Sequence, residues 1–489
     1  MWYIQSMKTA FKKFIPWIVL ILIVGGLLAW YFISNRVTSE ENANYDAKIA
    51  EAQKWYEGRE YSTAMSTYYA AAELIPSRVE AFEGIVNILT DKNRMDEALS
   101  ILDQSAQKLS SYDQSTLYAI LCERYLGSGD NAKALETCKK GQGLGEVNQN
   151  LELALGKAYI KNGDAGNASE VLKKNIYDGD NLSEATLLLS YIQSISDTES
   201  AKTTLGSTSP SDNWKIYFEE FSEVLGSLDS DSKYNAAKLA RVFINNGYPH
   251  LAVSILEPIE SEITEYLEGV YFLGRAYFEI DDYDQAINEL NKAATLGSLE
   301  SDTFWTMARA YMQKNDLSSA LDCYAKALGY QGSTPSENLV SEYLDILIAN
   351  NQTLKADEVL QVVLGKSKSA YLYEYGVRIN YILEKPEKIN YYIEQLGALD
   401  LDEDEKKEYL YLKARAMLDQ NANISDISSV LDELLALDRF NAKYYYLLGR
   451  SEFEQGDAES AKQALNKSME YDLQYEITED SSKLLSSID

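Results

Sequence analysis

A spacing of 34 residues between similar side chains constrains the fold of this chain more than any other feature. Residues 271–293 and 305–327 align without a gap, although few of their letters are identical. Each copy carries apolar residues every three or four positions in two runs, with a short polar turn between them, which is the pattern of two amphipathic helices. A period of this length indicates stacked units that pack only against their neighbours. We therefore expect an all-α solenoid.

The repeated residues resemble those of the tetratricopeptide repeat (TPR) family. In that family a Leu-Gly pair and a tyrosine mark the first helix, and two alanines flank a bulky residue in the second. The clearest copy contains Leu273, Gly274, Tyr277, Ala286, Leu290 and Ala293. Other clear copies are centred on Tyr159, Tyr311 and Tyr445. The resemblance implies an α-solenoid of about a dozen TPR-like helix pairs, with small residues where paired helices approach closely.

The register of the copies divides the chain into two blocks. We assign residues 45–205 to an N-terminal TPR block and residues 233–475 to a C-terminal one. Residues 206–232 break the register with a Ser/Pro-rich loop and one amphipathic helix, so we interpret them as an irregular joint. Residues 476–489 contain the helix-start letters TEDS and are expected to form a helix that caps the array.

An uncharged apolar stretch near the N-terminus, FIPWIVLILIVGGLLAWYFI at residues 14–33, is long enough to span a hydrocarbon core of ~30 Å. Tryptophans stand near both of its ends, as interfacial anchors do. Lysines precede the stretch and acidic residues follow it, so the positive-inside rule places residues 1–13 in the cytoplasm. We therefore expect a single-pass protein of the cytoplasmic membrane, with a juxtamembrane linker at 34–44 and an extracytoplasmic TPR body.

Other interpretations of this stretch remain open. It could be a cleaved signal peptide, although the apolar core of such a peptide is usually ~7–15 residues long. The array could instead face the cytoplasm, as in organelle import receptors or co-chaperone-like TPR proteins with the same anchor, because the charge difference amounts to a few residues. Gly25 and Ala29 form a small-xxx-small pair, which hints at weak self-association of a membrane helix.

Composition narrows the range of functions. The formal net charge of -31 argues against nucleic-acid binding, which needs clustered lysine and arginine. A single histidine, His250, excludes a catalytic or metal-binding histidine pair. The acidic run at 400–405 lacks the glycine of a calcium loop, and the glycines at 141–145 lack the lysine of a phosphate loop. We expect no enzyme, metal or cofactor; an enzyme with an unrecognised site is the remote alternative.

The chain has three cysteines, Cys122, Cys138 and Cys323, and none of them forms a C-x-x-C motif. We expect all three to be buried thiols that pack as small apolar side chains. A bridge between Cys122 and Cys138 is the alternative, which depends on whether the two side chains meet in the fold.

The TPR resemblance implies that the first helix of each unit lines the concave side of the array. Positions separated by four and then three residues share one face of such a helix. In this chain they carry mostly basic, aromatic and large aliphatic side chains. The candidate partner-binding residues are Lys157, Ile160, Arg241, Ile244, Tyr271, Arg275, Phe278, Trp305, Arg309, Met312, Tyr446, Arg450 and Phe453.

Arginine recurs in this register at Arg241, Arg275 and Arg309. In one interpretation the aromatic side chains hold an extended peptide or helix, and the guanidinium groups bind its carboxylates or carbonyls. In the other the arginines pair with acids on neighbouring helices and serve the fold. The sequence predicts a scaffold for protein partners, and the resemblance to membrane-anchored TPR proteins of bacteria implies envelope assembly or secretion as its setting.

Overall fold

The computed structural model describes most of the chain. The described ranges are 38–174, 176–297, 300–332, 335–473 and 475–488. All regular structure within them is helical, so the predicted all-α solenoid is confirmed. The predicted cytoplasmic segment, membrane helix and self-association pair lie outside these ranges. Within them, no helix combines the length and apolar character that crossing a bilayer requires.

The N-terminal part of the array consists of five helix pairs followed by a single helix, α12 (Lys215–Gly226). The pairs are α2 (Ser39–Glu57) with α3 (Tyr61–Leu74), α4 (Glu80–Asp91) with α5 (Met95–Ser105), α6 (Ser111–Gly127) with α7 (Asn131–Gln142), α8 (Gln149–Lys161) with α9 (Ala165–Leu172), and α10 (Gly179–Ser194) with α11 (Thr198–Gly206). Helix α2 begins inside the segment assigned to the linker, because Thr38 and Glu41 form a capping box there.

Seven further pairs and a terminal helix, α28 (Thr478–Ile488), complete the described array. The pairs are α13 (Ser232–Asn245) with α14 (Pro249–Leu256), α16 (Leu267–Glu279) with α17 (Tyr283–Leu296), α18 (Glu300–Gln313) with α19 (Leu317–Tyr330), α20 (Glu337–Ala349) with α21 (Thr353–Leu364), α22 (Ala370–Ile382) with α23 (Pro386–Gly397), α24 (Glu403–Asp419) with α25 (Ile424–Leu437), and α26 (Ala442–Glu454) with α27 (Ala458–Tyr471). Two short turns, η1 (Glu257–Ile259) and α15 (Glu260–Ile263), follow α14.

A recurring two-residue signal makes the turn within five of the pairs. The first residue has a φ between 59° and 83° and ends the first helix, as left-handed residues do. The second is an aspartate whose side chain accepts a hydrogen bond from a backbone N–H in the first turn of the next helix. The five turns are Gly129-Asp130, Gly163-Asp164, Asp281-Asp282, Asn315-Asp316 and Gly456-Asp457.

Small residues set the distance between paired helices, as the sequence predicts. A Cβ atom added to Gly274 on α16 would lie 2.9 Å from Cγ of Leu290 on α17, which is closer than real Cβ contacts. Gly376 on α22 faces Tyr392 on α23 in the same way. Ala286, on the α17 side of this contact, is fully buried. Each pair is thus a tight hairpin that stacks on the next.

The irregular joint is organised around Tyr191 on α10. Its ring contacts Phe221 of α12 at a centroid distance of 4.5 Å and Phe243 of α13 at 5.5 Å. Tyr248, in the turn after α13, lies 6.3 Å from the same ring. Both α12 and the α13–α14 pair therefore pack on α10, and α12 has no second helix of its own.

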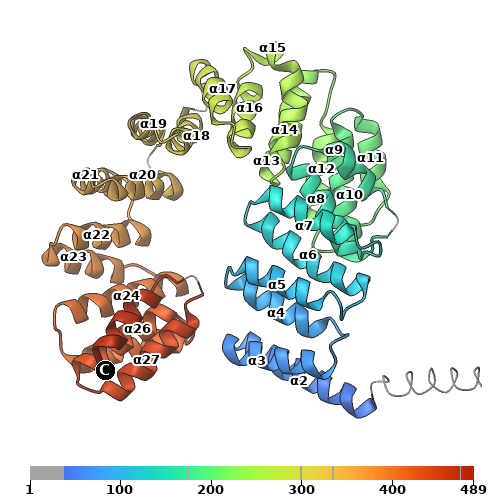
Figure 1. Cartoon of the computed structure of the whole chain (residues 1–489). Coiled ribbons are helices and arrows are strands. Elements are labelled where there is room, and N and C mark those ends of the chain that lie inside the picture. Colours follow the sequence, from blue (N-terminus) through green and yellow to red (C-terminus); the bar gives the residue numbers. More distant parts are fainter. Residues whose placement is uncertain (1–37, 175, 298–299, 333–334, 474, 489) are drawn as a thin grey trace, which may run out of the picture.

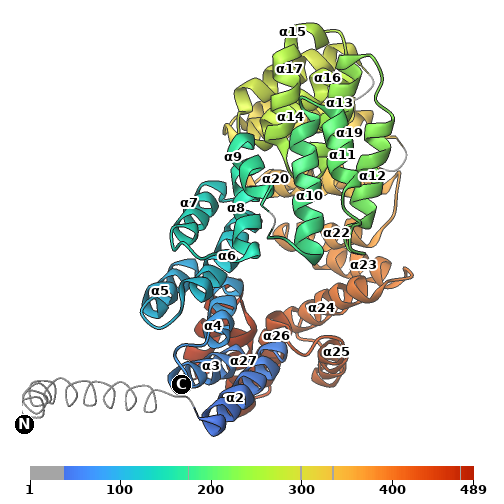
Figure 2. The ribbon, with the colours of Figure 1, turned by 90° about the vertical axis from the view of Figure 1, so that its right-hand side faces the viewer.

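The array curves until its two ends meet. Figure 1 shows the last pairs, from α24 on, returning towards α2 and α3, and Figure 2 agrees from the side. Leu473 packs against the apolar cluster of the first units. The Tyr471 hydroxyl donates a 3.5 Å hydrogen bond to the Glu60 carboxylate, and the Arg59 guanidinium lies 5.9 Å from the Phe440 ring centroid.

The expectation of three free thiols is wrong for two of the cysteines. Cys122 on α6 and Cys138 on α7 form a disulfide, with their Cα atoms 5.5 Å apart. They meet because they face one another across the hairpin, where other units pack small apolar side chains. Cys323 on α19 is a buried thiol, as expected, and burial raises its pKa to about 11.

Candidate functional site

Ion pairs connect neighbouring first helices along the array. In each pair a basic residue on one first helix contacts an acidic residue about one repeat away, on the preceding first helix. Successive first helices are in contact, which brings these side chains together. The pairs are Arg124–Asp91 at 2.8 Å, Lys157–Glu123 at 2.9 Å, Arg378–Asp345 at 2.5 Å and Arg450–Asp419 at 3.0 Å. Two of the predicted site residues, Lys157 and Arg450, thus pair with acids on neighbouring helices.

Lys157 is the most enclosed of these cations. Its ammonium group also contacts Glu184 on α10 at 3.2 Å, so it joins three consecutive first helices. Burial opposes its charge, but the carboxylates of Glu123 and Glu184 outweigh that effect and raise the pKa of Lys157. A side chain held on both sides in this way has no free donor group to offer a partner.

Arg241, Arg275 and Arg309 depart from this pattern. Arg241 on α13 is exposed and has no ion pair or hydrogen bond within the described residues. Arg275 on α16 forms no ion pair there and donates a long hydrogen bond of 3.4 Å to the amide oxygen of Asn245. Arg309 on α18 approaches Glu342 only to 3.7 Å. Three first helices in succession thus carry an arginine without a close carboxylate.

Glu342 on α20 is only loosely paired with Arg309 because it serves other donors. The indole N–H of Trp305 donates to its Oε2 at 2.7 Å, and the hydroxyl of Tyr324 donates to the same oxygen at 3.1 Å. The guanidinium of Arg309 lies instead over the ring of Phe278, 5.1 Å from the centroid, and 6.0 Å from that of Trp305. Cation and aromatic surface therefore stand side by side on α16 and α18.

Several predicted site residues do not belong to a contact surface. Ile160, Ile244 and Tyr271 lie in the core with at most 7% of their surface exposed, because they face the neighbouring helices. Met312 is half-buried, whereas Phe453 is exposed. Tyr446, Arg450 and Phe453 all lie on α26, four first helices beyond α18. The predicted set therefore separates into a central group on α13, α16 and α18, one distant group on α8 and another on α26.

Sequence reasoning missed a cavity of about 550 Å³ between α22, α24 and α26. Its residues are Glu374, Tyr375, Arg378, Tyr381, Ile382, Glu408, Tyr411, Leu412, Arg415 and Lys443. A signal for it was present in the register, because Glu374 stands four residues before Arg378 as Tyr271 stands four before Arg275. The spacing of the repeats departs from 34 residues near α22, so the correspondence between Glu374 and Tyr271 is hard to recognise in the sequence.

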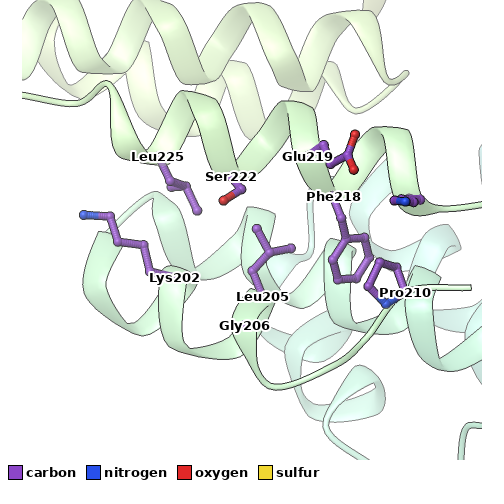
Figure 3. Close-up of a pocket in the computed structure, with 9 residues that line it drawn as sticks. Lys202, Leu205, Gly206, Pro210, Phe218, Glu219, Ser222 and Leu225 are labelled. Atoms are coloured by element: carbon purple, nitrogen blue, oxygen red, sulfur yellow. The ribbon is translucent and has the colours of Figure 1, made fainter.

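A second cavity, of about 500 Å³, lies between α11 and α12. Figure 3 shows Leu205 from α11 and Phe218 and Leu225 from α12 pointing into the space between the helices, with Lys202 at one end and Pro210 at the other. It exists because α12 lacks a second helix. None of its residues belongs to the predicted set.

The chain is similar to one known repeat family and, at low identity, to several solved structures. A tetratricopeptide repeat family model matches residues 267–296, 301–334 and 442–475, whereas no curated protein matches significantly. Among solved structures, yeast Tom70 is 15% identical over 92% of this chain and 95% of that chain, with a TM-score of 0.35. Naa15/Naa10 bound to HypK is 12% identical over 91% and 96%, with a TM-score of 0.38. Pseudomonas aeruginosa pilF is 20% identical over 48% and 98%, with a TM-score of 0.31.

Proposed function

We propose that this chain, which contains tetratricopeptide repeats, is a scaffold without catalytic activity that binds protein partners. The observation that carries the proposal is the central arginine group, Arg241, Arg275 and Arg309, whose charges lack close carboxylate partners, together with the half-buried rings of Phe278 and Trp305 beside Arg309. No group of three histidine, cysteine, aspartate or glutamate side chains in the described part of the chain is arranged to hold a metal ion.

The geometry of the row favours an extended, acidic segment of the partner. Packed helices lie about 8–10 Å apart, and a chain in the extended polyproline II conformation advances about 3.1 Å per residue and points every third side chain to the same side. A peptide lying across α13, α16 and α18 would therefore place about every third side chain beside an arginine. Guanidinium groups bind carboxylates through paired hydrogen bonds.

The overall negative charge of the protein does not prevent an acidic peptide from binding. Its effect is screened beyond about 8 Å at physiological salt, so the local contacts with the arginines decide binding.

Reversing two of these charges should abolish binding without unfolding the protein. In the Arg275→Glu/Arg309→Glu variant, the affinity for a fluorescein-labelled (Gly-Ser-Glu)₄ peptide should fall at least about tenfold, since each reversal replaces an attraction by a repulsion. Fluorescence anisotropy measures the affinity. The melting temperature should stay nearly unchanged, because neither arginine forms a close ion pair.

The matched control is Lys355→Glu/Lys366→Glu. It reverses two exposed charges on and after α21, a second helix, and should bind the peptide like the wild type. A (Gly-Ser-Gln)₄ peptide should bind far more weakly than the acidic one. If the arginine variant unfolds, or if both peptides bind equally, the arginines serve the fold and the proposed site is wrong.

We further propose that residues 14–33 anchor the chain in a cytoplasmic membrane and that the array lies on the extracytoplasmic side, in a machinery such as envelope assembly or secretion. Two observations support this placement: the charge difference across the apolar stretch, and the disulfide between Cys122 and Cys138. Disulfides form and persist in oxidising compartments and are rare in the cytosol.

Labelling in intact cells tests the placement. Ser230, in the exposed turn between α12 and α13, is replaced by cysteine, while the buried thiol of Cys323 stays inaccessible. A membrane-impermeant maleimide should label Ser230→Cys before the cells are opened. Labelling that requires lysis would place the array in the cytoplasm, as in the import-receptor alternative.

A further inference from the structure

The cavity between α22, α24 and α26 contains charges of both signs, and two of its three basic residues have close carboxylate partners outside the lining. Arg378 pairs with Asp345 at 2.5 Å, Arg415 approaches Asp419 to 3.8 Å, and Lys443 pairs with Glu476 at 2.9 Å. Each of these acids lies outside the cavity lining. Arg378 and Lys443 are therefore neutralised by acids outside the cavity, whereas Arg415, like Arg309, lacks a close carboxylate.

The two carboxylates of the cavity have no such partner. Glu374 on α22 and Glu408 on α24 form no ion pair within 4.0 Å and no hydrogen bond in the described part of the chain. Glu374 is half-buried, and Glu408 is exposed. They stand 34 residues apart, at equivalent positions of consecutive first helices. Lys443 and Arg415 favour the charge of Glu408, whereas no cation does so for Glu374, so the unmatched charge of the cavity lies at Glu374 and is negative.

Tyrosine rings form much of the remaining lining. Tyr375 and Tyr381 come from α22 and Tyr411 from α24. The guanidinium of Arg415 already lies 4.5 Å from the ring centroid of Tyr381, which shows that this aromatic surface accepts a cation. An aliphatic stem can pack along such rings while its charged end reaches a carboxylate.

We propose that this cavity is a docking site for a lysine side chain of a protein partner, with the ammonium group held by Glu374 and Glu408. The site deepens the proposed scaffold function and rests on it for the biological partner, but it lies on other helices than the central arginine group. A compact ammonium with three donors suits two separate carboxylates better than the planar fork of arginine. A partner that uses both sites would carry acidic and basic residues in separate stretches.

Acidity should weaken this docking. Burial, followed by the carboxylates of Glu408 and Glu405 on α24 and of Glu337 on α20, raises the pKa of Glu374 to about 7. Below that pH the side chain takes up a proton and loses the charge that attracts the ammonium. The other charged groups facing the cavity, Arg378, Arg415 and Lys443, remain positive in this range.

The test measures binding of an acetylated and amidated Ser-Gly-Lys-Gly-Ser peptide to the full chain by ligand-observed NMR. At pH 8 the Glu374→Gln/Glu408→Gln variant should bind at least about tenfold more weakly than the wild type. The Glu387→Gln/Glu394→Gln variant, which removes two exposed charges from the outer helix α23, should bind like the wild type. Wild-type affinity should fall at least about threefold between pH 8 and pH 6.

The same peptide with acetyl-lysine should not bind. The proposal is overturned if the acetylated peptide binds equally, if the glutamine pair leaves affinity unchanged while the protein stays folded, or if free 1,5-diaminopentane binds as tightly, which would indicate a site for small amines. The Arg275→Glu/Arg309→Glu variant should keep lysine-peptide binding, so a failure of the arginine site is distinguishable from a failure of this one.

Discussion

Replacing Gly376 by alanine should lower the free energy of unfolding by about 1–3 kcal/mol, which is the usual range for overpacking a tight core. The new Cβ would lie 2.6 Å from both Cγ and Cδ1 of Tyr392. These atoms are at the base of the ring, and the ring is 3% exposed. Its hydroxyl also accepts a 2.7 Å hydrogen bond from Gln361, so the tyrosine cannot swing aside. The α22–α23 hairpin would have to open instead.

Urea denaturation followed by circular dichroism measures this loss. Gly329→Ala is the matched control, because Gly329 lies on α19 with no other heavy atom within 4 Å of the added Cβ. Alanine there should leave stability unchanged or raise it by up to about 1 kcal/mol, since it restricts the unfolded chain. Equal stability of the two variants would mean that close approach of the paired helices is not what glycine provides.

Removing the disulfide should have a similar effect on the N-terminal block. The bridge joins residues 16 positions apart, and closing a loop of this size stabilises a folded protein by about 3 kcal/mol in the chain-entropy model. Cys122→Ala/Cys138→Ala keeps two small apolar side chains at these fully buried positions. The loss should therefore come almost entirely from the missing cross-link, and it should appear in the urea transition that includes α6 and α7.

Adding a reductant breaks the disulfide in the wild-type protein and so gives a direct comparison with the double alanine variant. Wild-type protein should lose the same stability when reduced, whereas the double alanine variant should not respond to reductant. Thiol titration of denatured, unreduced protein should find one free thiol, that of Cys323. Three thiols, together with stability that does not depend on reductant, would show that the hairpin is closed by packing alone.

Local features of the fold could be predicted from the sequence, because they depend on residues close together in the chain. The helix pairs follow from the 34-residue period, and turns such as Asp281-Asp282 carry both the left-handed residue and the helix cap within two letters. The small residue at Gly274 likewise needs only the partner helix of its own hairpin, where Leu290 packs. Each of these features lies within a single repeat.

Features that depend on stacking could not be predicted in the same way. Tyr271 and Ile244 share a helical face with Arg275 and Arg241, but neighbouring helices cover them, and no periodicity within one helix reports that contact. Whether an arginine is neutralised depends on the acid one repeat away, as Arg450 with Asp419 and the solitary Arg241 illustrate. The cavity beside Glu374 arises where three first helices meet.

The contact between Tyr471 and Glu60 joins residues 411 positions apart in a protein whose other contacts are mostly between neighbouring units. Every unit adds a small rotation, so the contact between the first and last described units depends on the sum of the angles of all the hairpins between them. An insertion that slightly alters the angle between two hairpins would leave the local packing intact. Because the change is carried through all the units that follow, it would still move the two ends of the array apart. The pitch of every hairpin in this protein is therefore under a common restraint.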